Sequence, residues 1–136
     1  MTAQSKLICG IILLTVPTIE YGGYFLLSVL SGKIKAPLTD FQKAMFRAGH
    51  AHAGVLVILS LIAQLFIDNA NLDPSLAWAL RMSFPLAAIL VSGGFFASAI
   101  GQNRTRPSGY ISILYFGALL LAASLVILGI ALIKSA

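Results

Sequence analysis

Charged residues are scarce in this sequence. Of its 136 residues only 10% are charged, whereas 59% are hydrophobic and the mean hydropathy is +0.96. An ordinary soluble domain carries about 25% charged residues. The composition therefore excludes such a domain and indicates an integral membrane protein.

Cysteine is nearly absent as well, and so are the motifs of soluble enzymes. Cys9 is the only cysteine, which excludes an intrachain disulfide and a metal site made of cysteines, and its apolar surroundings favour a packing role. The sequence contains no glycine loop for phosphate, no nucleophile elbow and no HExxH pair. Ser92-Gly93-Gly94 is typical of close helix packing rather than of a catalytic loop. Whether the chain is an enzyme stays open.

Four long apolar segments are present in place of such motifs. A hydrocarbon core about 30 Å thick needs roughly 20 residues of helix. We expect the membrane spans at residues 7–30, 44–67, 76–100 and 110–133. Short loops join them, so the expected fold is an all-α, integral membrane, up-down four-helix bundle, formed as a single domain over residues 1–136. The first span is too long for a cleaved signal peptide, and we expect it to be retained.

The net charge of +5 is explained by membrane topology rather than by binding of nucleic acid. Basic residues gather around the first and third loops, whereas the second loop carries two aspartates. By the positive-inside rule, loops one and three are cytoplasmic and both termini lie outside, in the inner (plasma) membrane of the cell. The residues concerned are Lys33, Lys35, Lys43, Arg47, Arg104 and Arg106 on the cytoplasmic side and Asp68 and Asp73 on the other.

Small residues are frequent where the helices are expected to approach one another, which favours close packing within the chain or between copies. Arg47 and Arg81 lie near the ends of their segments, and we expect both side chains to extend to the lipid headgroups. The small residues are Gly22, Gly23, Ala48, Gly49, Ala51, Ala53, Gly54, Gly93, Gly94, Gly117 and Ala118.

Three ionisable side chains lie at membrane depth: Glu20, His50 and His52. A charged residue at a helix centre costs about 2.5 to 3.5 kcal/mol on insertion scales, so each ionisable group needs a partner or a function. At 100° per residue, His50 falls on the more polar stripe of its segment, together with Gln64, and we expect this stripe to face the bundle. The simplest partner of His50 is a hydrogen bond to Glu20 or Tyr21.

His52 lies two residues further on, about 200° around the helix, on an apolar face. A polar group without a hydrogen bond is costly there. We therefore expect a partner for His52 outside this face: another helix, another copy of the chain or a ligand. The two-residue spacing also excludes binding of one metal ion by both histidines from a single straight helix.

A histidine pair that serves two environments from one helix resembles the catalytic subunit of haem-copper oxidases and nitric oxide reductases. In that family one helix carries His-x-His followed by small or apolar residues, and its two histidines ligate two haems on opposite sides. The stretch Gly49-His50-Ala51-His52-Ala53-Gly54 matches this pattern, and Phe46-Arg47 before it is similar to an arginine that precedes a haem-ligating histidine in another helix of the family. The resemblance is confined to this stretch, and the family's other histidine-bearing helices are missing here.

The resemblance implies haem b ligated through its iron by His50 and His52, with Arg47, Gly49 and Gly54 around the macrocycle, for electron transfer or for binding a diatomic gas such as oxygen or nitric oxide. The family's large subunit consists of three four-helix arcs, and this chain has the size of one. The resemblance therefore implies a homotrimer as well, in which histidines of different copies approach the same iron.

Polar residues of the first span allow other functions. Glu20 lies at a depth similar to that of His52, and with Tyr21, Tyr24 and Gln64 it would form a proton path or a hydrogen-bonded shell around the histidines. A second hypothesis is a channel or transporter in which Glu20 and His50 conduct protons or a metal ion. A third is a structural subunit of a larger membrane complex.

Overall fold

The computed structural model describes residues 1–136 and contains four α-helices. These are α1 (Ala3–Leu30), α2 (Asp40–Asn69), α3 (Pro74–Ala99) and α4 (Ile111–Lys134). Each is long and apolar enough to cross a membrane. The all-α fold and the four predicted spans are therefore confirmed, although α2 is longer at both ends than the sequence suggested.

Capping side chains define where the helices begin. Thr39 and Gln42 form a capping box, because each side chain accepts a hydrogen bond from the other residue's backbone N–H. Asp73 caps α3, and Pro74 occupies its first turn, where the missing N–H of proline is not needed. These caps satisfy backbone donors that a helix start would otherwise leave unpaired.

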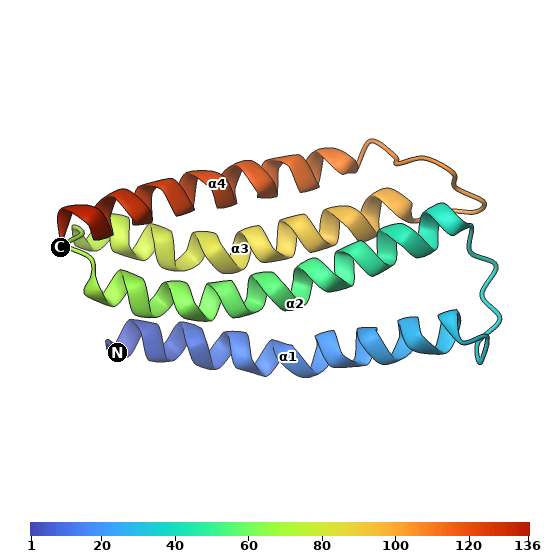
Figure 1. Cartoon of the computed structure of the whole chain (residues 1–136), viewed down its shortest axis with the longest axis horizontal. Coiled ribbons are helices and arrows are strands. Elements are labelled where there is room, and N and C mark those ends of the chain that lie inside the picture. The colour runs from blue at the N-terminus through green and yellow to red at the C-terminus, as the bar shows by residue number, and fades with distance from the viewer.

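Consecutive helices run antiparallel (Figure 1). The first and third loops lie together at one end, which we call the basic end because it carries most of the lysines and arginines. The two termini and the second loop lie at the other end, which we call the terminal end. At the basic end, Gln42 Nε2 donates to the carbonyl oxygens of Ala99 and Gly101, at 2.9 and 2.8 Å, so the start of α2 is tied to the end of α3.

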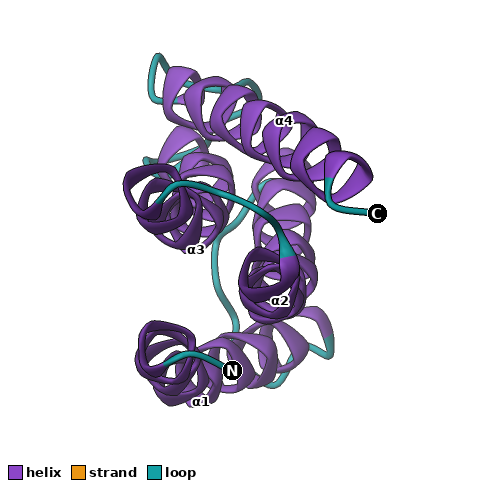
Figure 2. Ribbon diagram, turned by 90° about the vertical axis from the view of Figure 1, so that its left-hand side faces the viewer, coloured by secondary structure: helices purple, strands orange, loops and turns teal.

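The bundle is open rather than closed. Viewed along the helices, α1 and α4 lie at opposite edges, with α2 and α3 between them (Figure 2), and α1 makes no contact with α4. The buried hydrophobic clusters join α2, α3 and α4, and α1 contributes to neither of them. Their members are Ala63, Ile67, Leu80, Phe84 and Leu128 in one cluster and Leu56, Ala88 and Val91 in the other.

Two glycines hold α3 and α4 close together. A Cβ atom added at Gly94 would lie 2.5 Å from the backbone nitrogen of Leu114, and one added at Gly117 would lie 2.8 Å from the backbone nitrogen of Val91. Close packing at these glycines is therefore confirmed. Many large apolar side chains remain exposed around the outside of the four helices, which is consistent with contact to lipid.

Substitution of Gly94 should test this contact. In Gly94→Ala the new methyl group meets backbone rather than a flexible side chain, so we expect a loss of about 1–3 kcal/mol in the free energy of unfolding, as for other overpacked sites. Gly129→Ala is the matched control, because nothing lies within 4 Å of a Cβ atom added there. Unfolding in detergent, followed by circular dichroism, measures both, and equal effects would contradict the proposed role of Gly94.

Candidate functional site

The two histidines of α2 contact different helices. His50 is half-buried against α1, where Gly22 and Gly23 leave a notch for its ring: a Cβ atom added at Gly23 would lie 2.9 Å from Nε2 of His50. The ring of His52 instead lies against Phe95 of α3, with the ring centroids 4.8 Å apart. The prediction that the two rings lie on different sides of α2 is confirmed.

His52 has a defined hydrogen-bonding state. Its Nδ1 lies 2.8 Å from the carbonyl oxygen of Ala48, one turn earlier in α2. A carbonyl oxygen only accepts, so Nδ1 carries the proton and donates it there. Nε2 then keeps its lone pair, and the side chain is exposed. In the neutral ring His52 therefore keeps an acceptor nitrogen without a hydrogen-bond partner, on an exposed residue of a membrane-spanning helix.

His50 makes no hydrogen bond in the structure, so the predicted bond to Glu20 or Tyr21 is not formed. Both of these side chains are exposed on α1. Tyr24 is exposed too, and its hydroxyl oxygen accepts a hydrogen bond from Lys33 Nζ at 3.0 Å. These side chains lie in the half of α1 that passes His50, but none of them forms a hydrogen bond with it.

Gln64 lies apart from the histidines. It is 14 positions beyond His50 in α2, which corresponds to about 21 Å along the helix, and it is completely buried near the terminal end. Together with the exposed positions of Glu20, Tyr21 and Tyr24, this separation means that the predicted proton path is not assembled within one chain.

The residues expected around the macrocycle differ in their surroundings. A Cβ atom at Gly49 would lie 3.0 Å from the ring of Phe96, so Gly49 serves the packing of α2 on α3. Gly54 faces open space, since nothing lies within 4 Å of an added Cβ. Arg47 is exposed and forms no ion pair, one turn closer to the basic end than His50.

A buried polar cluster at the terminal end was missed by the sequence analysis, which placed Arg81 at the headgroups. The residue is only 3% exposed. Its Nη2 lies 2.6 Å from Oδ1 of Asp68, and its Nη1 donates to the hydroxyl of Ser5. Gln64 Nε2 donates to the carbonyl oxygen of Arg81 at 3.2 Å. Arg81 is thus bound within the protein and does not extend to the lipid surface.

This Arg81 cluster joins three helices, because Ser5 comes from α1, Asp68 and Gln64 from α2, and Arg81 from α3. Ser5 Oγ also donates to Oδ1 of Asp68 at 2.7 Å, and Thr2 donates to the same carboxylate through its hydroxyl at 2.9 Å. Such a network satisfies the charge at the edge of the membrane. The sequence did hold a signal for it: opposite charges near the ends of two helices that a short loop connects.

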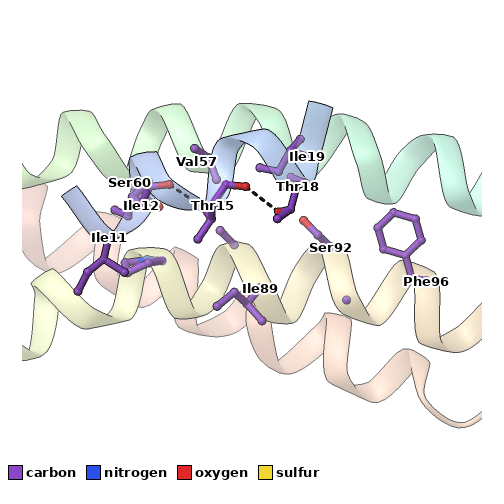
Figure 3. Close-up of a pocket in the computed structure, with 14 residues that line it drawn as sticks. Ile11, Ile12, Thr15, Thr18, Ile19, Val57, Ser60, Ile89, Ser92 and Phe96 are labelled. Carbon is purple, nitrogen blue, oxygen red and sulfur yellow. Dashed lines mark hydrogen bonds between the residues drawn. The ribbon is translucent and has the colours of Figure 1, made fainter. Parts of the chain in front are cut away.

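A cavity of about 430 Å³ lies between α1, α2 and α3 (Figure 3). Neither histidine lines it, nor does any other ionisable side chain. Elsewhere in the chain, no group of three or more His, Cys, Asp or Glu side chains gathers that could hold a metal ion.

No protein-family model matches this chain, and no curated protein or solved structure matches it either. We therefore infer the function from the geometry of its side chains.

The Arg81 cluster should dominate the attachment of α1. Arg81→Leu takes the guanidinium away from the Asp68 carboxylate, which keeps its hydrogen bonds from Ser5 and Thr2 and a contact of 3.9 Å with the N-terminal ammonium. Breaking a buried ion pair costs about 3–5 kcal/mol, and these remaining partners should place the loss at the lower end. The double variant Arg81→Leu/Asp68→Asn removes both charges and should recover much of that loss. Unfolding in detergent measures the free energies.

Arg47→Leu is the matched control, because it removes an exposed arginine that has no ion pair. We expect it to change the stability little. An equal effect of the two single substitutions would show that the Arg81 cluster does not stabilise the fold.

Proposed function

We propose that this chain is a small membrane haem b protein in which His52 ligates the iron on an outer face of the chain, at the contact between copies. The observation that carries the proposal is the state of His52, an exposed residue whose Nδ1 is held by Ala48 while its Nε2 has no hydrogen-bond partner. A hydrogen bond from Nδ1 to a backbone carbonyl is the usual support for a metal-ligating histidine, since it fixes the tautomer and orients the ring.

The environment of His52 supports a ligand from outside the chain. In lipid the lone pair of Nε2 has no hydrogen-bond donor, and a polar group without a partner is costly there. Haem iron accepts a neutral imidazole nitrogen, so coordination would remove that cost. Ala51 and Val55 lie beside His52 on the exposed face. Their short apolar side chains leave room for the flat haem macrocycle.

The macrocycle would have to lie between copies. The cavity of one chain is not lined by His52, so the space beside the ligand has to be closed by a second chain. This need supports a homo-oligomer, and the resemblance to three four-helix arcs favours a trimer. Arg47, exposed and unpaired near the basic end, would bind a haem propionate in such an assembly.

His50 is the proposed second ligand, from another copy. Its Nε2 now faces the notch at Gly23, so ligation requires the ring to turn out of that notch. The absence of a hydrogen bond to His50 supports such a turn, because no bond has to be broken. Bis-histidine haem b supports electron transfer, whereas a haem with one open axial position binds a diatomic gas.

The separated polar residues weaken the competing hypothesis of a proton or metal channel. Glu20 is exposed on α1, and Gln64 belongs to the Arg81 cluster. We also propose that the basic end is cytoplasmic and that the membrane is the plasma membrane, because the positive-inside rule places clustered lysines and arginines on that side.

Absorption spectroscopy tests the haem proposal. Protein purified from haem-replete cells should show a Soret band. His52→Ala should lower the bound haem per chain by about tenfold or more, because losing even the hydrogen bond that orients a metal-ligating histidine lowers metal affinity about tenfold to a hundredfold. His50→Ala should convert a six-coordinate spectrum to a five-coordinate one. Asn69→Ala is the control, since it removes another side-chain bond to a carbonyl one turn earlier in α2. A parent protein without a Soret band would end the proposal.

Cysteine accessibility tests the orientation. In a Cys9→Ser background, Asn71→Cys places a thiol in the second loop and Gln102→Cys places one in the third. A membrane-impermeant maleimide added to intact cells should label the Asn71→Cys variant at once and the Gln102→Cys variant only after lysis. The reverse pattern would overturn the proposed topology.

A further inference from the structure

The cavity between α1, α2 and α3 is apolar but contains four hydroxyl groups. Eight of its 14 lining residues are hydrophobic. The hydroxyls belong to Thr15 and Thr18 of α1, Ser60 of α2 and Ser92 of α3, and all four residues line the same space (Figure 3). The volume of about 430 Å³ falls in the range of small-molecule sites.

Three of these hydroxyls are already satisfied by their own helices. Thr15 donates to the carbonyl oxygen of Ile12, and Thr18 to that of Thr15, each at 2.6 Å. Ser60 donates to the carbonyl oxygen of Leu56 at 2.7 Å. This is the ordinary solution for serine and threonine in a membrane helix, where no water is present to bind them.

Ser92 is the exception. It is only 7% exposed, and its Oγ has no hydrogen-bond partner. Figure 3 shows the hydroxyl directed from α3 toward the side of the cavity where Thr18 lies. A buried donor without an acceptor is unfavourable, so the unmet requirement in this cavity is a hydrogen-bond acceptor.

The depth and charge of the cavity narrow the choice of acceptor. Ser92 lies seven positions before Ala99, the last residue of α3, and 18 positions after Pro74, the first, so it is about 10 Å from one helix end and about 27 Å from the other. This places it inside the hydrocarbon, below the level of charged headgroups. No ionisable side chain lines the cavity, so nothing there compensates a charged ligand.

We propose that the cavity binds an uncharged, lipid-soluble molecule whose carbonyl oxygen accepts the hydrogen bond of Ser92. A carbonyl group is an acceptor that brings no donor of its own, so it satisfies Ser92 without a new unpaired group. The apolar walls receive the rest of the molecule. The site is open to the bilayer, because Ile89 on its wall is 68% exposed. This proposal does not depend on haem.

Fluorescence quenching in liposomes tests the site. A tryptophan introduced by Ile89→Trp, in a Trp78→Phe background, reports on the cavity wall. The probes are bromododecanone, a ketone, and bromododecane, which has the same chain and bromine but no carbonyl. The parent Trp78 lies 11 positions earlier in α3, about 16 Å away, and reports the bulk partitioning of each probe. If the Ile89→Trp variant fails to fold, Ile11→Trp on the opposite wall replaces it.

We expect the ketone to quench the cavity tryptophan with saturation, while Trp78 is quenched in linear proportion to the probe. Ser92→Ala should raise the half-saturating ketone concentration about threefold to tenfold, the effect of one lost hydrogen bond. Ser98→Ala is the matched control, because it removes a buried hydroxyl of the same helix that is bonded to Phe95 and lies outside the cavity. Gly93→Leu should fill the cavity and abolish saturation, whereas Gly129→Leu should not.

Two outcomes would overturn the proposal. Linear quenching of the cavity tryptophan by both probes would show that there is no site. In the second outcome, quenching of the cavity tryptophan saturates at the same concentration for the ketone and the alkane, with no effect of Ser92→Ala. That result would show that the cavity holds a lipid acyl chain and that Ser92 does not select a carbonyl group. Neither result bears on the Soret band, so failure here is distinguishable from failure of the haem proposal.

Discussion

The ion pair between Arg81 and Asp68 is the interaction on which the arrangement of α1 depends. The hydrophobic clusters of the bundle belong to α2, α3 and α4 alone, and the apolar side chains that α1 buries, Ile8, Ile12, Leu26 and Val29, lie outside these clusters. Through Ser5 the pair fixes the terminal end of α1, and the notch at Gly23 receives His50 further along. The cavity lies between these two attachments, beside residues 11–19 of α1.

The histidines illustrate how one helix can serve two surfaces. His50 is directed toward α1 and His52 toward α3 and the lipid, because two positions along a helix turn a side chain by about 200°. The hydrogen bond from His52 to Ala48 selects one tautomer of the imidazole, since Nδ1 carries the proton and only Nε2 is left to act as a ligand. In the proposed haem protein, this nitrogen of His52 would bind the iron at the contact between two copies. The chemistry of His52 and the assembly of several copies are therefore parts of the same proposal.

Hydropathy and helical periodicity were sufficient to predict the four spans and the opposite placement of the two histidines. They failed for Arg81, because a cation near a helix end normally reaches the headgroups, and because the predicted second span ended at residue 67. The real helix continues to Asn69, and this extension places Asp68 one helical turn beyond Gln64, where both meet Arg81. The expected hydrogen bond of His50 to Glu20 or Tyr21 was inferred from the tendency of polar groups to pair within a membrane, which does not determine how α1 is rotated. The cavity depends on the distances between helices, and the periodicity of the sequence does not predict these distances.

The glycines between α3 and α4 hold these two helices more closely than α1 is held on the bundle. Backbone packs directly on backbone at Gly94 and Gly117, so α3 and α4 have little room to shift against each other at these two levels. Over part of its length α1 is separated from α3 by the cavity, and no such backbone contact holds it there. A change in the volume of the cavity would therefore displace α1 more readily than it would part α3 from α4.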